Sequence, residues 1–206
     1  MRTLSLAVAV LAMLPAAAGA LEPVVALRLG VGAGLGSAAR DVPMSDVVPV
    51  QYPVQLDLLA REGPLAAGAY GSVGLASAGR CPGVSCSAWA ARVGLQGTWT
   101  FALEGGPEPW VGVASGYEWI TEERHQGGTI TSRYRGFEAL AVQGGVEWRL
   151  WRWLAVGPYG LVSGGRYARY SLDTGLEQGS VAIPDRAIHV WLQIGVRGRL
   201  VLGERP

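Results

Sequence analysis

The segment from Ile188 to Leu202 restricts the fold of this chain more than any other segment. Its even positions are almost all apolar, whereas its odd positions are mostly polar, with Arg197 and Arg199 among them. An alternation of period two is typical of a β-strand with one apolar face and one polar face. Because this segment is about three times as long as a usual strand of roughly five residues, it predicts a tilted strand that crosses a membrane.

Seven further segments repeat the alternation, and none of their connections carries a helical pattern. They are residues 24–36, 48–60, 65–76, 89–103, 110–121, 133–150 and 153–172. In the segment 153–172 the alternation does not decide which residues face the lumen. Leu154 and Val162 would place the apolar face at the even positions, whereas Tyr159 and Leu161 would place it at the odd positions. The pattern predicts one all-β domain, residues 21–206, with eight antiparallel strands.

The connections between these segments alternate in length. Residues 37–47, 77–88, 122–132 and 173–187 form long connections, and residues 61–64, 104–109 and 151–152 form short ones. A closed transmembrane barrel with short periplasmic turns and long external loops has this pattern. Aromatic residues near the strand ends predict two interfacial girdles: Trp110, Trp148, Trp151 and Trp153 on the short-turn side, and Trp89, Tyr117 and Trp119 on the other.

A soluble barrel with an apolar interior is the alternative to a membrane barrel. The composition of the polar face favours the membrane, because that face is mostly Gly and Ala with a few charges. Small residues fit the narrow interior of an eight-stranded barrel, which is only wide enough for its own side chains.

Residues 21–206 as a whole resemble the small eight-stranded outer-membrane β-barrels formed by the OmpA transmembrane domain, OmpX and the OmpW group. The resemblance rests on the strand pattern and the alternating connections. It implies an eight-stranded antiparallel up-and-down transmembrane β-barrel in a Gram-negative type of outer membrane. It also implies lipid and lipopolysaccharide as surroundings.

The first 20 residues have the features of a cleaved secretory signal peptide. Arg2 precedes an apolar run from Leu4 to Leu14, and Ala18-Gly19-Ala20 forms the cleavage site. In an exported protein, Cys81 and Cys86 are expected to form a local disulfide. We expect no metal site and no cofactor, because the two histidines lie far from this pair in the sequence.

The charge balance argues against nucleic acid as a partner. The chain has 17 basic residues, all of them arginines, and 16 acidic residues. No basic patch is evident in the sequence.

Charged residues on the predicted inner face form the candidate site. They are Arg28, Asp57, Arg92, Glu118, Glu147, Arg149, Arg197 and Arg199. Arg92 and Glu118 fall toward the outside, and the other six fall toward the periplasmic end. We expect a salt-bridged plug, because an unpaired charge in a dry lumen costs several kcal/mol. The alternative is a narrow polar path or a ligand cavity along the row Gly30, Gly32, Gly34 and Gly36, with an anion preference.

No catalytic residue is predicted. Ser163 and His189 form a conceivable pair for a lipid A-modifying enzyme, but no nucleophile motif accompanies them. Leu176, Val181 and Ile183 in the last long connection indicate either a contact with another protein or lipopolysaccharide, or a loop folded over the barrel mouth.

The sequence therefore favours a non-enzymatic membrane anchor or interaction component, which includes a part in an envelope-spanning assembly for motility, secretion or export. Other cell-envelope proteins would then be its partners, through the external loops or the periplasmic rim. A porin-like narrow channel and a lipid A-modifying enzyme are the alternatives.

Overall fold

The computed structural model describes residues 21–79, 81, 85–101, 106–125, 128–185 and 187–202. The predicted signal peptide, residues 1–20, lies outside the described residues. In the described part of the chain, no helix is long and apolar enough to cross a membrane.

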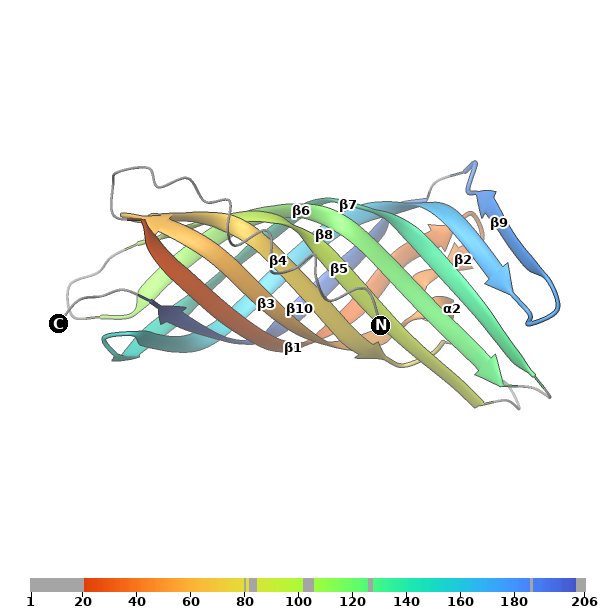
Figure 1. The fold of residues 1–206 in the computed structure, drawn as a ribbon, viewed down its shortest axis with the longest axis horizontal. Coiled ribbons are helices and arrows are strands. Elements are labelled where there is room, and N and C mark those ends of the chain that lie inside the picture. The colour runs from red at the N-terminus through yellow and green to blue at the C-terminus, as the bar shows by residue number, and fades with distance from the viewer. Residues whose placement is uncertain are drawn as a thin grey trace.

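Eight of the described strands close into a ring (Figure 1). They are β1 (Glu22–Ala39), β3 (Val50–Glu62), β4 (Leu65–Ala76), β5 (Ser85–Thr100), β6 (Glu108–His125), β7 (Thr129–Trp151), β8 (Leu154–Asp173) and β10 (His189–Val201). Each strand pairs antiparallel with the next one in this order, and β10 also pairs with β1 from Val24↔Val201 to Gly36↔His189. The prediction of an eight-stranded antiparallel barrel is confirmed.

The barrel is apolar outside and polar inside. The side chains of Leu75, Leu95 and Ile194 are 75%, 70% and 67% exposed, whereas Arg28 and Asp57 are fully buried. Adjacent residues on one strand face opposite sides of the sheet, so this contrast follows directly from the alternation in the sequence. An apolar wall around a charged interior is suited to lipid and not to water.

The aromatic residues divide between the wall and the lumen. Trp148, Trp151 and Trp153 are exposed on the outer wall near the short turns, as predicted. The prediction that places Trp110 in the same girdle is wrong, because its side chain is only 1% exposed and lies inside the barrel. Gly145 makes room for it, since a Cβ there would lie 3.1 Å from the Trp110 Nε1.

The burial pattern gives the inward faces of β8, whose parity the sequence left open, and of β7. On β8, Tyr159 and Leu161 face the lumen and Val162 faces outward. On β7, an irregularity in the pairing between Glu138 and Leu140 shifts the phase of the strand. Glu138 is therefore buried in the lumen, whereas Ala139, which uninterrupted alternation would place on the inner face, is exposed.

The end of the barrel opposite the short turns is more ordered than the sequence predicts. β6 extends to His125 and β7 begins at Thr129, so both strands run through a segment that was expected to be a loop. Contacts between β7 and β8 support this extension: the rings of Tyr134 and Tyr170 lie 5.0 Å apart. We call this the loop end; the other end carries the short turns and is the turn end, which faces the periplasm in barrels of this class.

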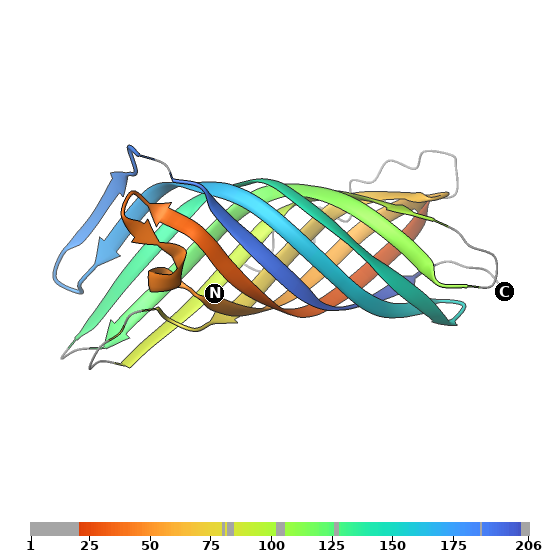
Figure 2. The same cartoon turned by 180° about the vertical axis from the view of Figure 1, so that it is seen from behind.

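Two further segments expected to be loops also contain regular structure at the loop end. A short strand, β9 (Gln178–Ala182), pairs with β8. The first long connection contains β2 (Val42–Pro43) and the single-turn helix α2 (Met44–Val47). Figure 2 shows α2 and β9 at the end of the barrel away from the end of β10.

The helix α2 packs into the mouth of the barrel at the loop end. Met44, Val47 and Val48 are almost completely buried in a cluster with the inward-facing Ile120 and Trp191. Val48 was expected to begin the alternating segment 48–60, and this is wrong, because β3 begins only at Val50 and Val48 packs with α2 in the mouth.

Candidate functional site in the barrel lumen

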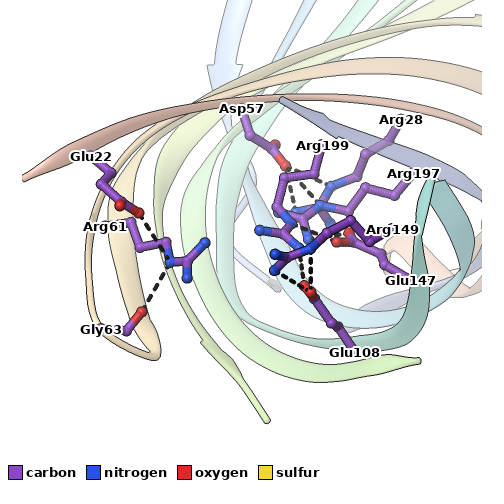
Figure 3. A network of polar contacts seen from close by, with 10 residues as sticks. All are labelled: Glu22, Arg28, Asp57, Arg61, Gly63, Glu108, Glu147, Arg149, Arg197 and Arg199. Carbon is purple, nitrogen blue, oxygen red and sulfur yellow. Dashed lines mark hydrogen bonds and ion pairs between the residues drawn. The ribbon is translucent and has the colours of Figure 1, made fainter. Parts of the chain in front are cut away.

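The charged side chains of the lumen gather in two clusters. We call Arg28, Asp57, Glu108, Glu147, Arg149, Arg197 and Arg199 the turn-end cluster (Figure 3). Arg92, Glu118, Glu138 and His189 form the loop-end cluster. Among the described residues, Glu108, Glu138 and His189 are the members that were not among the lumen charges expected from the sequence.

Asp57 is the carboxylate that Arg28 and Arg197 share. The Arg28 Nε donates to Asp57 Oδ2 at 2.8 Å, and the Arg197 Nε lies 3.7 Å from the same oxygen. The remaining Arg28 donors reach the amide oxygens of Gln143 and of Gln96, the latter at 3.0 Å. Both glutamines have the inward parity in the sequence, but only the pairing of their strands places them around Arg28.

Glu147 and Glu108 neutralise the other arginines of this cluster. The Arg197 Nη1 donates to Glu147 at 2.7 Å, and the Arg199 Nε donates to its second oxygen at 2.6 Å. Arg199 also contacts Glu108, which accepts a hydrogen bond of 2.9 Å from Arg149. The Arg149 side chain is 47% exposed, so it lies at the rim of the barrel and not within the lumen as expected.

The indole of Trp110 lies against the two central arginines. Its ring centroid is 4.4 Å from the Arg197 Cζ and 5.3 Å from the Arg28 Cζ. A cation over an indole face is stabilised by the negative charge density of the ring. Trp110 therefore fills the lumen next to the buried charges, where a girdle residue would face lipid.

Glu118 is the centre of the loop-end cluster. Its Oε1 accepts hydrogen bonds from the Tyr167 hydroxyl at 2.5 Å and from the Trp191 Nε1 at 2.9 Å. Its Oε2 lies 3.4 Å from the His189 Nε2 and 3.6 Å from the Arg92 Nε. The His189 ring is stacked on Tyr167, with 4.1 Å between the ring centroids.

Glu138 holds the other side of Arg92. Its Oε2 lies 3.5 Å from the Arg92 Nη1, and its Oε1 accepts a hydrogen bond of 2.8 Å from the Tyr70 hydroxyl. Uninterrupted alternation along β7 would have placed Glu138 in lipid. No feature of the sequence therefore marks this residue as part of the lumen.

Side chains from other segments fill the lumen beside three of the four glycines predicted to form an inward row on β1, Gly30, Gly32 and Gly34. The prediction is wrong for Gly36, which is exposed and has a φ of 78°. A Cβ on Gly30 would lie 2.7 Å from the Tyr159 hydroxyl, and one on Gly32 would lie 2.7 Å from the Gln193 Cγ. A Cβ on Gly34 would lie 3.2 Å from the Met44 side chain. Gly30, Gly32 and Gly34 thus admit large neighbours into the lumen.

Cys81 and Cys86 form a disulfide at the loop end, as expected. Glu122 lies close enough for the three residues to resemble a set of metal ligands. The sulfur atoms are bonded to each other, however, so they cannot act as the thiolates that a metal site requires.

An apolar outer wall, a charged lumen and strands long enough to span a bilayer define a transmembrane β-barrel of the outer-membrane class. Its surroundings are therefore membrane lipid and, in the outer leaflet, lipopolysaccharide. No family model matches the sequence, and no curated protein matches it.

Solved structures of outer-membrane proteins are similar to this chain over most of its length. One of them is a major outer-membrane protein of Thermus thermophilus. The similarity covers 85% of this chain and 99% of the Thermus chain, with 15% sequence identity and a TM-score of 0.50. Neisserial surface protein A is similar over 86% of this chain and 94% of its own, with 12% identity and a TM-score of 0.42. The outer-membrane protease OmpT from Escherichia coli is similar over 88% of this chain and 93% of its own, with 9% sequence identity and a TM-score of 0.44. At these identities the Thermus protein shows a shared fold only.

Proposed function

We propose that this protein is a closed, non-conducting outer-membrane barrel that acts as a membrane anchor or interaction component and not as an enzyme. The observation that carries the proposal is the double closure of the lumen. Paired charges fill its turn end, and α2 fills its mouth at the loop end.

The turn-end cluster supports closure because its charges neutralise each other. Arg28, Arg197 and Arg199 are at most 5% exposed, and each approaches a carboxylate within 2.8 Å. Side chains held in this way do not coordinate a passing ion without losing their partners, which costs several kcal/mol for a buried pair.

An external contact surface supports the interaction role. Leu176 and Val181, on the hairpin formed by β8 and β9, are 97% and 60% exposed. Ile183, in the same connection, is buried in the cluster that fills the mouth. One end of this connection therefore closes the barrel, and its tip is free to contact another protein of the cell envelope.

The arrangement of Ser163 and His189 argues against a lipid-modifying enzyme. Both side chains face the lumen and are at most 2% exposed. A lipid substrate would approach from the outer wall, on the opposite face of the sheet. His189 instead contacts Glu118 and Tyr167, as a structural residue does.

Conductance in planar bilayers tests the closed lumen. We expect the folded wild-type protein to give no stable pore. A variant that combines Arg197→Ala and Glu147→Ala with Met44→Gly and Val47→Gly should show conductance bursts, because it removes side chains that block the turn end and side chains that fill the mouth. Arg197→Ala and Glu147→Ala without the changes in α2 should stay silent, because the mouth remains filled. Arg152→Ala, at an exposed turn, is the matched control and should stay silent. A stable wild-type pore that is lost in the double variant Arg92→Ala and Glu118→Ala would overturn the proposal in favour of a channel.

A further inference from the structure

Four arginines stand on the outer wall of the barrel near its loop end. Arg133 and Arg135 lie on β7, and Arg166 and Arg169 lie on β8; we call them the arginine patch. Arg135 pairs directly with Arg169, and their neighbours Tyr134 and Tyr170 pair with each other on the opposite, inner face. The arginine patch therefore faces the surroundings of the barrel and not the lumen.

The arginine patch begins where the lipid-facing apolar surface ends. On β7, Phe137 is 63% exposed on the outer wall, and the next two outward-facing residues toward the loop end are Arg135 and Arg133. On β8, Val162 is 51% exposed, and Gly164 and Arg166 follow it on the same face. This order along both strands places the guanidinium groups at the level of the lipid headgroups of the outer leaflet.

The four arginines lie apart from the carboxylates of the described residues. None of the four arginines takes part in an ion pair with a described residue, unlike Arg124, which contacts Glu122 at 2.8 Å. The Arg135 Nε is buried and has no hydrogen-bond partner. The nearest outward-facing carboxylates by strand position, Glu123 and Asp173, lie one step farther out, opposite Thr131.

Like charges directly opposite each other on a sheet repel, and an external anion would relieve the repulsion between Arg135 and Arg169. Arginine is well suited to phosphate, because its planar donors bind two phosphate oxygens at once. Phe137 and Tyr117 pair with each other immediately below, and their rings pack 5.0 Å apart. An apolar surface beneath a cationic one matches an amphiphile whose phosphate lies at the headgroup level.

We propose that the arginine patch binds the phosphate groups of the phosphorylated glycolipid of the outer leaflet, lipid A, while Phe137 contacts its acyl chains. The site lies outside the barrel and does not depend on whether the lumen conducts. It gives the protein a specific lipid ligand, in addition to the general lipid surroundings of any membrane barrel.

Native mass spectrometry of the folded protein in detergent tests the site, with bisphosphorylated lipid A as the probe. We expect wild-type protein to retain lipid A, and the double variant Arg135→Gln and Arg169→Gln to bind it about tenfold more weakly, which corresponds to a loss of about 1.4 kcal/mol. Arg152→Gln, a charge removal at the turn end, is the matched control and should bind like the wild type.

The source of the phosphate is tested on the wild-type protein alone, so the result does not depend on a variant that folds. Dephosphorylated lipid A should bind about tenfold more weakly than the bisphosphorylated form, and inorganic phosphate should not compete at equal concentration. Equal binding of both lipid A forms, equal binding by the double variant, or equal retention of phosphatidylglycerol would overturn the proposal.

Discussion

Arg28 and Arg197 stand directly opposite each other across the seam between β1 and β10, and Asp57 lies between their guanidinium groups. Two arginines at adjacent positions on a sheet would normally repel. Here each has a carboxylate, and the indole of Trp110 lies within 5.3 Å of both Cζ atoms. The seam that closes the barrel is therefore also the place where its buried charges are most concentrated.

Replacing Asp57 with Asn should destabilise the barrel strongly. The change leaves Arg28 without its closest carboxylate in a buried position, and breaking a buried ion pair from one side costs about 3–5 kcal/mol. Urea unfolding in lipid vesicles, followed by tryptophan fluorescence, measures the loss. Asp185→Asn is the control: its partner Arg40 is 74% exposed, so the expected loss is below about 1 kcal/mol. Equal losses for the two variants would contradict the proposed role of the cluster.

Replacing Gly30 with Ala should cost about 1–3 kcal/mol of unfolding free energy, because the new methyl group overpacks the lumen. Its Cβ would lie 2.7 Å from both the Ile194 carbonyl oxygen and the Tyr159 hydroxyl. Adding Tyr159→Phe should recover part of the loss. Gly71→Ala, where a Cβ has no neighbour within 4 Å, should change stability by no more than about 0.5 kcal/mol. An unaffected Gly30→Ala variant would indicate open space beside β1.

Removing the disulfide should leave the barrel intact. The double variant Cys81→Ser and Cys86→Ser opens a small external loop, and the chain-entropy relation gives a loss of about 2 kcal/mol for a loop of this size. The variant should still migrate as a heat-modifiable folded barrel on a gel. Labelling of unfolded wild-type protein with maleimide should occur only after reduction. Labelling without reduction would show that the pair is not bonded in the cell.

N-terminal sequencing of the protein purified from outer membranes should begin at Leu21. The signal peptidase requires small residues at the cleavage site, so Ala20→Tyr should leave an uncleaved precursor. Ala60→Tyr, a substitution far from this site, should not affect processing. A mature chain that retains residues 1–20 would disprove the predicted signal peptide.

The period of two accounts for most of what the sequence reveals. A strand has only two faces, so one well-defined alternation decides for every residue whether it faces the lumen. This is why the seam strand, and with it Arg197 and Arg199, is readable without a structure. The ambiguity on β8 arises because Tyr159 and Leu161 are large residues placed inside, opposite glycines such as Gly30.

The features that the sequence does not reveal depend on contacts between distant segments. The phase shift beside Glu138 is a local irregularity that no residue type marks. The burial of Met44 depends on the space left by Gly34 and on the ring of Trp191, which lies far away in the sequence. The position of Trp110 near a strand end suggests a girdle residue. Only its inward parity, together with its contacts to Arg28 and Arg197, shows that it fills the lumen.

The distribution of charges over the strands has a consequence for assembly. Arg28 and Asp57 come from the first two strands of the ring, and Arg197 comes from the last. An incomplete sheet would expose these groups to acyl chains, so a partly formed barrel is penalised in the bilayer until its ends meet. We therefore expect the strands to insert into the membrane and the barrel to close in one step. A partly closed barrel would leave its interior charges in contact with acyl chains and would not remain inserted.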